Sequence, residues 1–203
     1  MSSIIKFSFI YKIKSYKNNY YIFTGGPGAG KSSVLDELKN RDYPVVAEVA
    51  RKVIKEQVAI GGDATHMGNR VAFRDLMLKH SIAGYTDHLQ TKGKVFFDRG
   101  IPDLYGYSEL IKVPVSEYIK QAIEEYRYNA TVFMFPPWQE IYSNDEERKQ
   151  DFQEALTTYH TIKKGYIKSG YDLIEVPKAS INNRATFILE KIEYINENQF
   201  KPQ

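Results

Sequence analysis

GGPGAGKS, residues Gly25–Ser32, decides the fold of this chain. The stretch matches the phosphate-binding pattern G-x-x-x-x-G-K-[ST], with an apolar run, Tyr20–Thr24, before it and a helical pattern, Lys31–Asn40, after it. Glycines let successive backbone N–H groups face one anion, and the positive end of the following helix points at the same place. The sequence therefore predicts a nucleoside-triphosphate site. Its predicted binding residues are Gly26, Pro27, Gly28, Ala29, Gly30, Lys31, Ser32 and Ser33.

Further apolar runs alternate with helical patterns along the chain. The expected strands are Tyr20–Thr24, Tyr43–Ala47, Val95–Asp98, Thr131–Phe135 and Tyr171–Val176. The expected helices after Lys31–Asn40 are Met67–Gln90, Val115–Tyr126, Asp145–Lys168 and Ile181–Ile195. This alternation predicts an α/β fold with three layers, in which a five-stranded parallel sheet carries helices on both faces. We expect one P-loop domain over residues 20–198, after an amino-terminal extension of residues 1–19.

Charged side chains follow two of these strands, at the sheet edge where ligands of open α/β sheets bind. Asp98 ends the third strand and is suited, with the Ser32 hydroxyl, to hold Mg²⁺; Arg99 follows it. Glu48 follows the second strand and is a candidate base for an acceptor hydroxyl. Arg51 lies three residues later, on the same side of a helical turn. The alternatives are a capping role for Asp98 and a surface ion pair between Glu48 and Arg51.

A polar segment after the fourth strand predicts a lid. Residues 138–150 follow Pro136 and Pro137 and include Arg148, which could neutralise a transferring phosphoryl group while the lid excludes water. The alternative is a solvated run of charges. The loop Val176–Ser180 follows the fifth strand, where many P-loop folds hold the nucleotide base, and the absence of an N-K-x-D guanine motif favours ATP.

Composition limits the class of partner. Hydrophobic residues make up 42% and charged residues 26%, which excludes wholesale disorder, and there is no cysteine for a disulfide or a thiolate metal site. The formal charge of +3 is weak for a protein that binds nucleic acid through its phosphates. No apolar run reaches the roughly 20 residues of a membrane span, and the first residues lack a signal-peptide cleavage site, so we expect a cytoplasmic protein.

Several motifs occur in order, and together they resemble one family. They are TGGPGAGKSS (24–33), AEVAR (47–51), FFDRGIPD (96–103), FMFPPW (133–138), DEER (145–148), GYDLIEVP (170–177) and NNRATFIL (182–189). This set resembles the NadR/TRP-translocation-type AAA-domain family of small P-loop ATPases, over roughly Tyr20 to Ile195.

The resemblance implies a single domain that binds ATP with Mg²⁺, on a sheet with the kinase-like strand order 2-3-1-4-5. Relatives include the nicotinamide riboside kinase domain of NadR and, more distantly, the deoxynucleoside kinases. These relatives have a glutamate after the second strand, here Glu48, and an acidic–arginine pair after the third, here Asp98-Arg99. The chain departs from deoxynucleoside kinases in having Asp98 in place of Glu and Gly100 in place of Ser.

Two functions follow as hypotheses. The first is a small-molecule kinase, with Glu48 as base, Asp98 organising Mg²⁺, and Lys31, Arg99 and Arg148 stabilising the transferred charge. Its acceptor would be lined by Arg51, Asp103 and Tyr105. The second is a nucleotide-dependent binding module at a membrane surface, suggested by the Lys-rich residues 1–19 and by family members linked to trafficking and phosphoinositides. The acceptor and the oligomeric state stay open at this point.

Overall fold

The computed structural model describes residues 15–142 and 151–199 of the chain. Its strands are β1 (Ser15–Tyr16), β2 (Tyr20–Gly25), β3 (Val45–Val46), β4 (Val95–Asp98), β5 (Tyr126–Arg127), β6 (Thr131–Phe135) and β7 (Asp172–Glu175). Its helices are α1 (Lys31–Asn40), α2 (Val49–Ile60), α3 (Arg70–Thr86), α4 (Asp103–Leu110), α5 (Glu117–Glu125), the short 3-10 helix η1 (Gln139–Ile141), α6 (Phe152–Lys168) and α7 (Ile181–Gln199).

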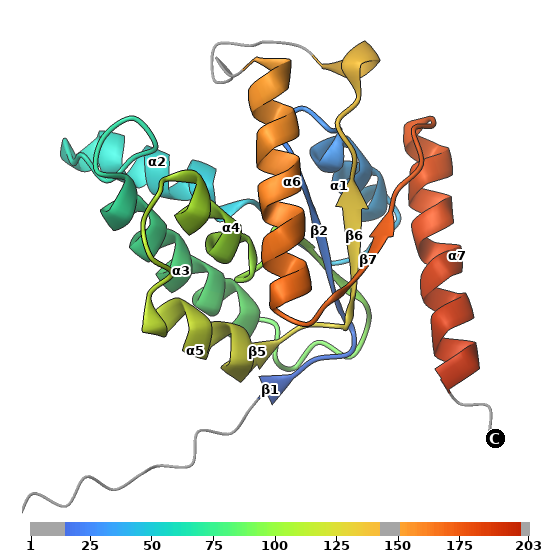
Figure 1. Ribbon diagram of the computed structural model, residues 1–203. Coiled ribbons are helices and arrows are strands. Elements are labelled where there is room, and N and C mark those ends of the chain that lie inside the picture. Colours follow the sequence, from blue (N-terminus) through green and yellow to red (C-terminus); the bar gives the residue numbers. More distant parts are fainter. Residues whose placement is uncertain (1–14, 143–150, 200–203) are drawn as a thin grey trace, which may run out of the picture.

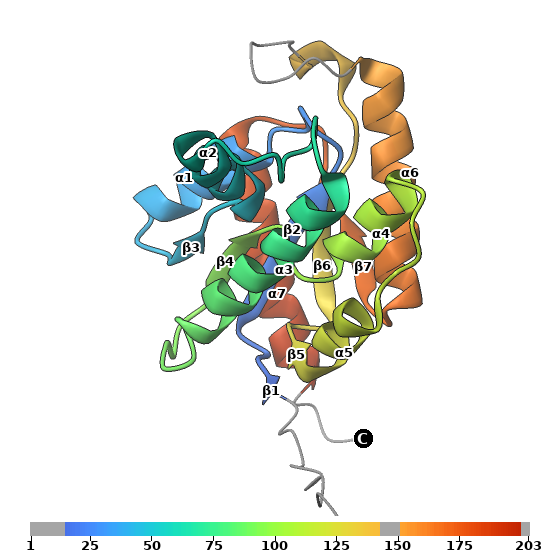
Figure 2. The ribbon, with the colours of Figure 1, turned by 90° about the vertical axis from the view of Figure 1, so that its left-hand side faces the viewer.

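A five-stranded parallel sheet forms the centre of the molecule, in the order β3-β4-β2-β6-β7 (Figures 1 and 2). Counted along the chain, these strands have the predicted order 2-3-1-4-5, so the predicted fold class is confirmed. β1 and β5 add a separate two-stranded parallel sheet. The glycine-rich stretch begins at Gly25, the last residue of the middle strand β2, and so starts at the centre of the sheet's carboxyl edge.

Helices cover both faces of the sheet, because successive side chains of the buried strands point to opposite sides. Tyr20 and Ile22 pack with α3, α4, α5 and α6 on one face, in a core rich in tyrosine. Tyr21 and Phe23 pack with α1 and α7 on the other face. β2 is buried along its whole length, which holds the loop that follows it in a fixed place.

Two further helices, α2 and α4, are absent from the helices expected from the sequence. In α2 the residues Val49, Ala50, Val53 and Ile54 recur at helical spacing and pack against the core, while Val58 and Ile60 are exposed. α4 has eight residues and a glycine, Gly106, in its middle, which lowers helix propensity.

The boundaries of other elements differ modestly from those expected. The expected strand Tyr43–Ala47 is reduced to β3, and the helix expected over Met67–Gln90 is α3, which begins after Asn69 because that side chain accepts a hydrogen bond from the amide of Ala72. The helix expected over Asp145–Lys168 is described from Phe152, after the capping box of Asp151 and Glu154.

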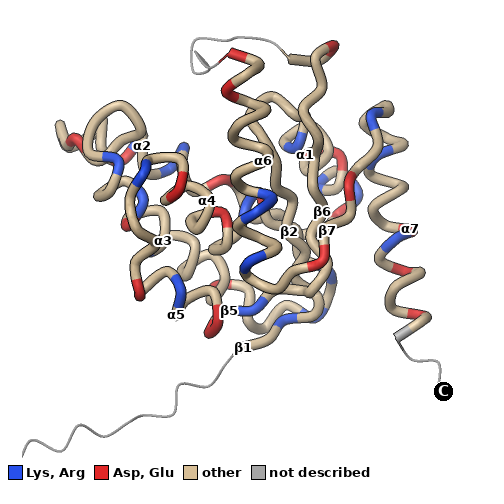
Figure 3. Tube along the Cα trace, in the orientation of Figure 1, with Lys and Arg blue, Asp and Glu red and all other residues tan. Residues whose placement is uncertain are grey.

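The described part of the chain contains no helix long and apolar enough to cross a bilayer. Lysine and arginine alternate with aspartate and glutamate over the described elements (Figure 3). Of the expected extension, residues 1–14 lie outside the described residues. Of the expected lid, residues 143–150 lie outside them.

Candidate active site

The loop between β2 and α1 has the backbone that its glycines make possible. Gly25 has φ 140°, and a Cβ there would lie 2.3 Å from the carbonyl oxygen of Phe135, so a side chain cannot be fitted. Gly28 and Gly30 have φ 70° and 75°. The turn brings the chain into the start of α1 at Lys31, with Ser32 and Ser33 exposed in its first turn.

Lys31 lies inside this turn. Its ammonium is buried and donates a hydrogen bond of 3.0 Å to the carbonyl of Gly26. Burial, followed by the charge of Arg99, lowers the pKa of Lys31 to about 8, against the opposing effect of nearby carboxylates. Those carboxylates are Asp98, Glu48 and Asp103, so these three residues and Arg99 lie close enough to Lys31 to affect its charge.

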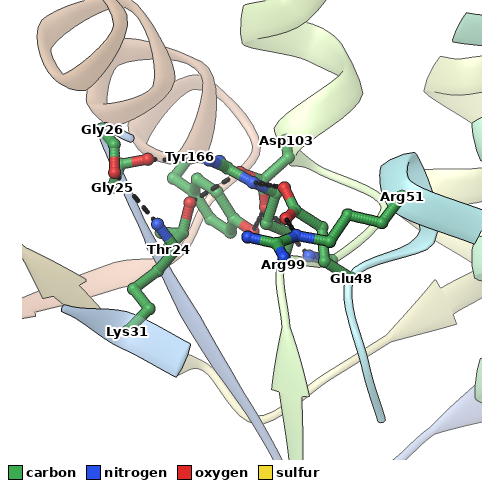
Figure 4. A network of polar contacts seen from close by, with 10 residues as sticks. Thr24, Gly25, Gly26, Lys31, Glu48, Arg51, Arg99, Asp103 and Tyr166 are labelled. Carbon is green, nitrogen blue, oxygen red and sulfur yellow. Dashed lines mark hydrogen bonds and ion pairs between the residues drawn. The ribbon is translucent and has the colours of Figure 1, made fainter. Parts of the chain in front are cut away.

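Arg99 connects the groups at this edge of the sheet (Figure 4). Its Nε donates to Glu48 at 2.8 Å, and its Nη1 donates to Asp103 at 3.0 Å and to the carbonyl of Gly25 at 3.2 Å. Arg51 lies on the other side of Glu48, with 3.6 Å between its Nε and Glu48 Oε2. Arg99 has φ 71°, an uncommon conformation for a residue with a side chain, and three contacts hold it there.

The Glu48 side chain is an ionised carboxylate that remains partly exposed to solvent. Its burial would raise its pKa, but the charges of Arg99 and Lys31 and the hydrogen bond from Arg99 hold the pKa below its usual value. The side chain keeps 22% of its surface exposed at the position where β3 leads into α2. A hydroxyl can therefore approach it.

Asp98 has the character expected of a residue that holds a cation. It is buried, and its Oδ1 has no hydrogen-bond partner in the described structure. Burial raises its pKa to about 6, with Lys31 acting in the opposite direction and Glu48 adding to the rise. Mg²⁺ prefers few protein oxygens together with phosphate oxygens, so the unpartnered carboxylate oxygen of Asp98 and the exposed Ser32 at the start of α1 both fit this ion. The described residues contain no cluster of three or more His, Cys, Asp or Glu side chains that could hold a metal ion.

Asp103, expected to line an acceptor, lies within the protein framework. Its carboxylate accepts hydrogen bonds from the hydroxyl of Thr24 at 2.6 Å, the amide of Gly100 at 2.9 Å, Arg99 and the hydroxyl of Tyr166. Only 4% of the residue is exposed. Asp103 thus positions Arg99, and a direct contact with substrate stays a prediction.

The remaining expected site residues lie in different places. Tyr105 packs against α6, where the ammonium of Lys168 lies 5.3 Å from its ring centroid. Arg148 lies outside the described residues, while the beginning of the expected lid, Trp138 to Tyr142, is described and contains η1.

Three residues of the site were missed in the sequence. Thr24 and Tyr166 bind Asp103, and Arg184 of α7 donates to carbonyls of the phosphate loop. Thr24 belongs to an apolar strand, and Tyr166 lies on the apolar face of a helix. The sequence therefore predicts that both residues pack in the core. Arg184 lies early in a helix and directly follows two asparagines, and arginine is usually on the surface.

The fold and this cluster define a P-loop protein with the sheet order of the kinases. A family model described as "AAA domain" matches residues 20–184, and the chain belongs to this family. A comparison with curated protein sequences gives no match.

Solved structures of kinases share the fold. Deoxyadenosine kinase from M. mycoides, with the products dCMP and dCDP, is similar at TM-score 0.64 and 15% identity, over 86% of this chain and 99% of that one. NadR in complex with NR is similar at TM-score 0.61 and 15% identity, over 90% of this chain and 51% of that one. Thymidylate kinase from Ehrlichia chaffeensis is similar at TM-score 0.54 and 14% identity, over 87% of this chain and 99% of that one. At 14–15% identity these similarities show that the chain shares its fold with P-loop kinases.

Proposed function

We propose that this protein is a phosphotransferase that moves the γ-phosphoryl group of ATP, with Mg²⁺, to a hydroxyl group of a small nucleoside-like acceptor. One observation carries the proposal: Glu48, an ionised and partly exposed carboxylate, is held by Arg99 beside the phosphate loop. The structural similarity to deoxyadenosine kinase and to NadR supports a nucleoside-like acceptor.

The residues present can perform the transfer. Glu48 accepts a hydrogen bond from the acceptor hydroxyl and takes its proton as the oxygen forms a bond to the γ-phosphorus. The bond from that phosphorus to the oxygen bridging it to the β-phosphorus breaks, and ADP leaves. Lys31 and Arg99 supply fixed positive charge for the phosphoryl oxygens, and such prearranged charge stabilises the transition state without reorganisation.

Ser32 and Asp98 would hold the metal. When bound, Mg²⁺ neutralises charge on the β- and γ-phosphate oxygens. The remaining task of the chain is to hold the carboxylate and the hydroxyl at hydrogen-bonding distance and to exclude water. Arg148, in the lid expected over residues 138–150, stays the predicted source of additional positive charge.

Replacement of the candidate base tests the proposal. We expect Glu48→Gln to bind Mg-ATP with the affinity of the wild type and to transfer phosphate about 10²- to 10⁴-fold more slowly. Formation of ADP is measured with purified protein and a panel of deoxynucleosides, ribonucleosides and nicotinamide riboside. Phosphorylated product is identified by mass spectrometry, which separates transfer from hydrolysis.

Glu56→Gln is the matched control, because Glu56 lies on α2 beyond Glu48 and pairs with His80 instead of with Arg99. This variant is expected to retain the wild-type rate. Transfer by Glu48→Gln at the wild-type rate would exclude Glu48 as the base. ADP formation that no hydroxyl compound accelerates would exclude an acceptor of this class.

A further inference from the structure

Arg184 is a buried residue whose guanidinium contacts the backbone of the phosphate loop. It lies on α7, has 4% of its surface exposed, and packs with its Cζ 5.5 Å from the ring centroid of Trp138. Its Nη1 is 3.3 Å from the carbonyl oxygen of Ala29 and 3.5 Å from that of Gly30. Among the described residues no carboxylate forms an ion pair with it, and its Nε, also buried, has no partner. A buried cation without a counter-charge is costly and calls for a reason.

The two carbonyls that Arg184 contacts determine where two amides point. In a trans peptide the N–H and the C=O point in opposite directions. The carbonyl of Ala29 shares its peptide with the amide of Gly30, and the carbonyl of Gly30 shares its peptide with the amide of Lys31. Because Arg184 holds both carbonyls on the α7 side, both amides are turned the other way. These amides begin α1 and belong to the predicted phosphate-binding residues.

Gly30 provides the space for this guanidinium. It has φ 75°, and a Cβ at this position would lie 2.7 Å from Nη1 and 3.2 Å from Nη2 of Arg184. A side chain at residue 30 would therefore displace the guanidinium as well as strain the backbone. The glycine and the arginine fit one another across two elements that are about 150 residues apart in the chain.

A phosphate tail would supply the missing counter-charge. A cation at the carbonyl end of a peptide and an anion at its N–H end polarise the peptide in the same sense, and hydrogen bonds in such a chain strengthen one another. We propose that Arg184 is a positioning residue for the triphosphate: it orients the amides of Gly30 and Lys31 and adds positive charge behind them. This inference rests on the proposed function, because it deepens the account of how the donor is bound.

Binding of two ligands to three variants tests the proposal. The ligands are Mg-ATP and magnesium tripolyphosphate, which has the phosphates without the base, and both affinities are measured by calorimetry. We expect Arg184→Gln to lower the affinity for both ligands by the same factor. That factor is about tenfold, which is the size of effect expected from the loss of charge-assisted hydrogen bonds. Arg184→Lys keeps the charge but loses the planar fork, so we expect about a threefold loss for both.

Arg41→Gln is the matched control. Arg41 also bridges the two layers, since it donates to Asn182 and Thr186 of α7, but it does not contact the phosphate loop. It is expected to bind both ligands like the wild type. The binding stoichiometry separates a change in affinity from a loss of folded protein, because partial unfolding lowers the number of sites. If Arg184→Gln does not fold, the affinities of Arg184→Lys for the two ligands test the proposal.

Wild-type affinity of the Arg184 variants for tripolyphosphate would overturn the proposal. A loss confined to Mg-ATP would also overturn it, because the guanidinium would then act on the base or the ribose. Failure of the proposed function gives a different result. The Arg184 variants would then bind both ligands with lower affinity than the wild type, while the wild type phosphorylates no acceptor. A wild-type protein that binds neither ligand would overturn both.

Discussion

Four hydrogen-bond donors converge on the carboxylate of Asp103, and this arrangement explains how Arg99 is held. Thr24 comes from β2, Arg99 and Gly100 follow β4, and Tyr166 belongs to α6. A carboxylate is the one common side chain that only accepts hydrogen bonds and can serve four donors at once. The strand, the loop and the helix thus meet at a single group beneath Glu48.

Replacing this carboxylate by an amide is expected to be costly. In Asp103→Asn one oxygen becomes an NH₂ group that faces donors, and Arg99 loses a buried counter-charge. We expect a loss of about 3 kcal/mol in the free energy of unfolding, measured by urea denaturation. Asp36→Asn, an exposed position on α1, is the control and should stay within about 0.5 kcal/mol of the wild type. A small loss for Asp103→Asn would show that the four contacts contribute little.

The helices α4 and α6 approach one another through two glycines. A Cβ on Gly106 would lie 2.8 Å from Ile162 Cδ1 and 2.9 Å from Ile162 Cα, and a Cβ on Gly165 would lie 3.0 Å from the amide nitrogen of Gly106. α4 begins with Asp103 and α6 carries Tyr166, so the spacing of these helices determines whether the two side chains can bond (Figures 2 and 4).

Gly106→Ala is expected to push the two helices apart. A backbone atom, Ile162 Cα, blocks the new methyl group, so overpacking should lower the free energy of unfolding by about 2 kcal/mol in urea denaturation. Gly84→Ala in α3 is the matched control, because its Cβ would meet only the tip of Val46 at 3.1 Å and alanine favours a helix. Equal stabilities of the two variants would contradict this account of the α4–α6 contact.

The elements that the sequence predicts well are those with one dominant signal. β2, β4 and β6 are continuous apolar runs, and each is fully buried as such runs require. That Glu48 and Asp98 lie near one another could be predicted, because strand ends meet at one edge of a parallel sheet. The contacts of Asp103 and Arg184 could not, since each depends on a helix, α6 or α7, that arrives from more than 60 residues away and whose rotation the local pattern leaves open.

At the scale of the whole molecule, the phosphate loop joins the two halves of the core. β2 contributes Ile22 to the core of one face and Phe23 to the core of the other, and the loop that follows contacts α6 through Gly26 and α7 through Arg184. A ligand bound to this loop therefore adds its free energy of binding to the stability of both layers.

Mg-ATP is accordingly expected to protect the entire fold. At about 100 times its dissociation constant, a ligand that binds only the native state adds about 2.7 kcal/mol to the free energy of unfolding. For a chain of 203 residues this corresponds to a rise of roughly 5–10 °C in the melting temperature, measured by circular dichroism with the ligand present. Lys31→Met keeps the buried volume but removes the ammonium, so its rise at the same ligand concentration should be much smaller. Equal rises for the two proteins would mean that the stabilising ligand does not bind at this loop.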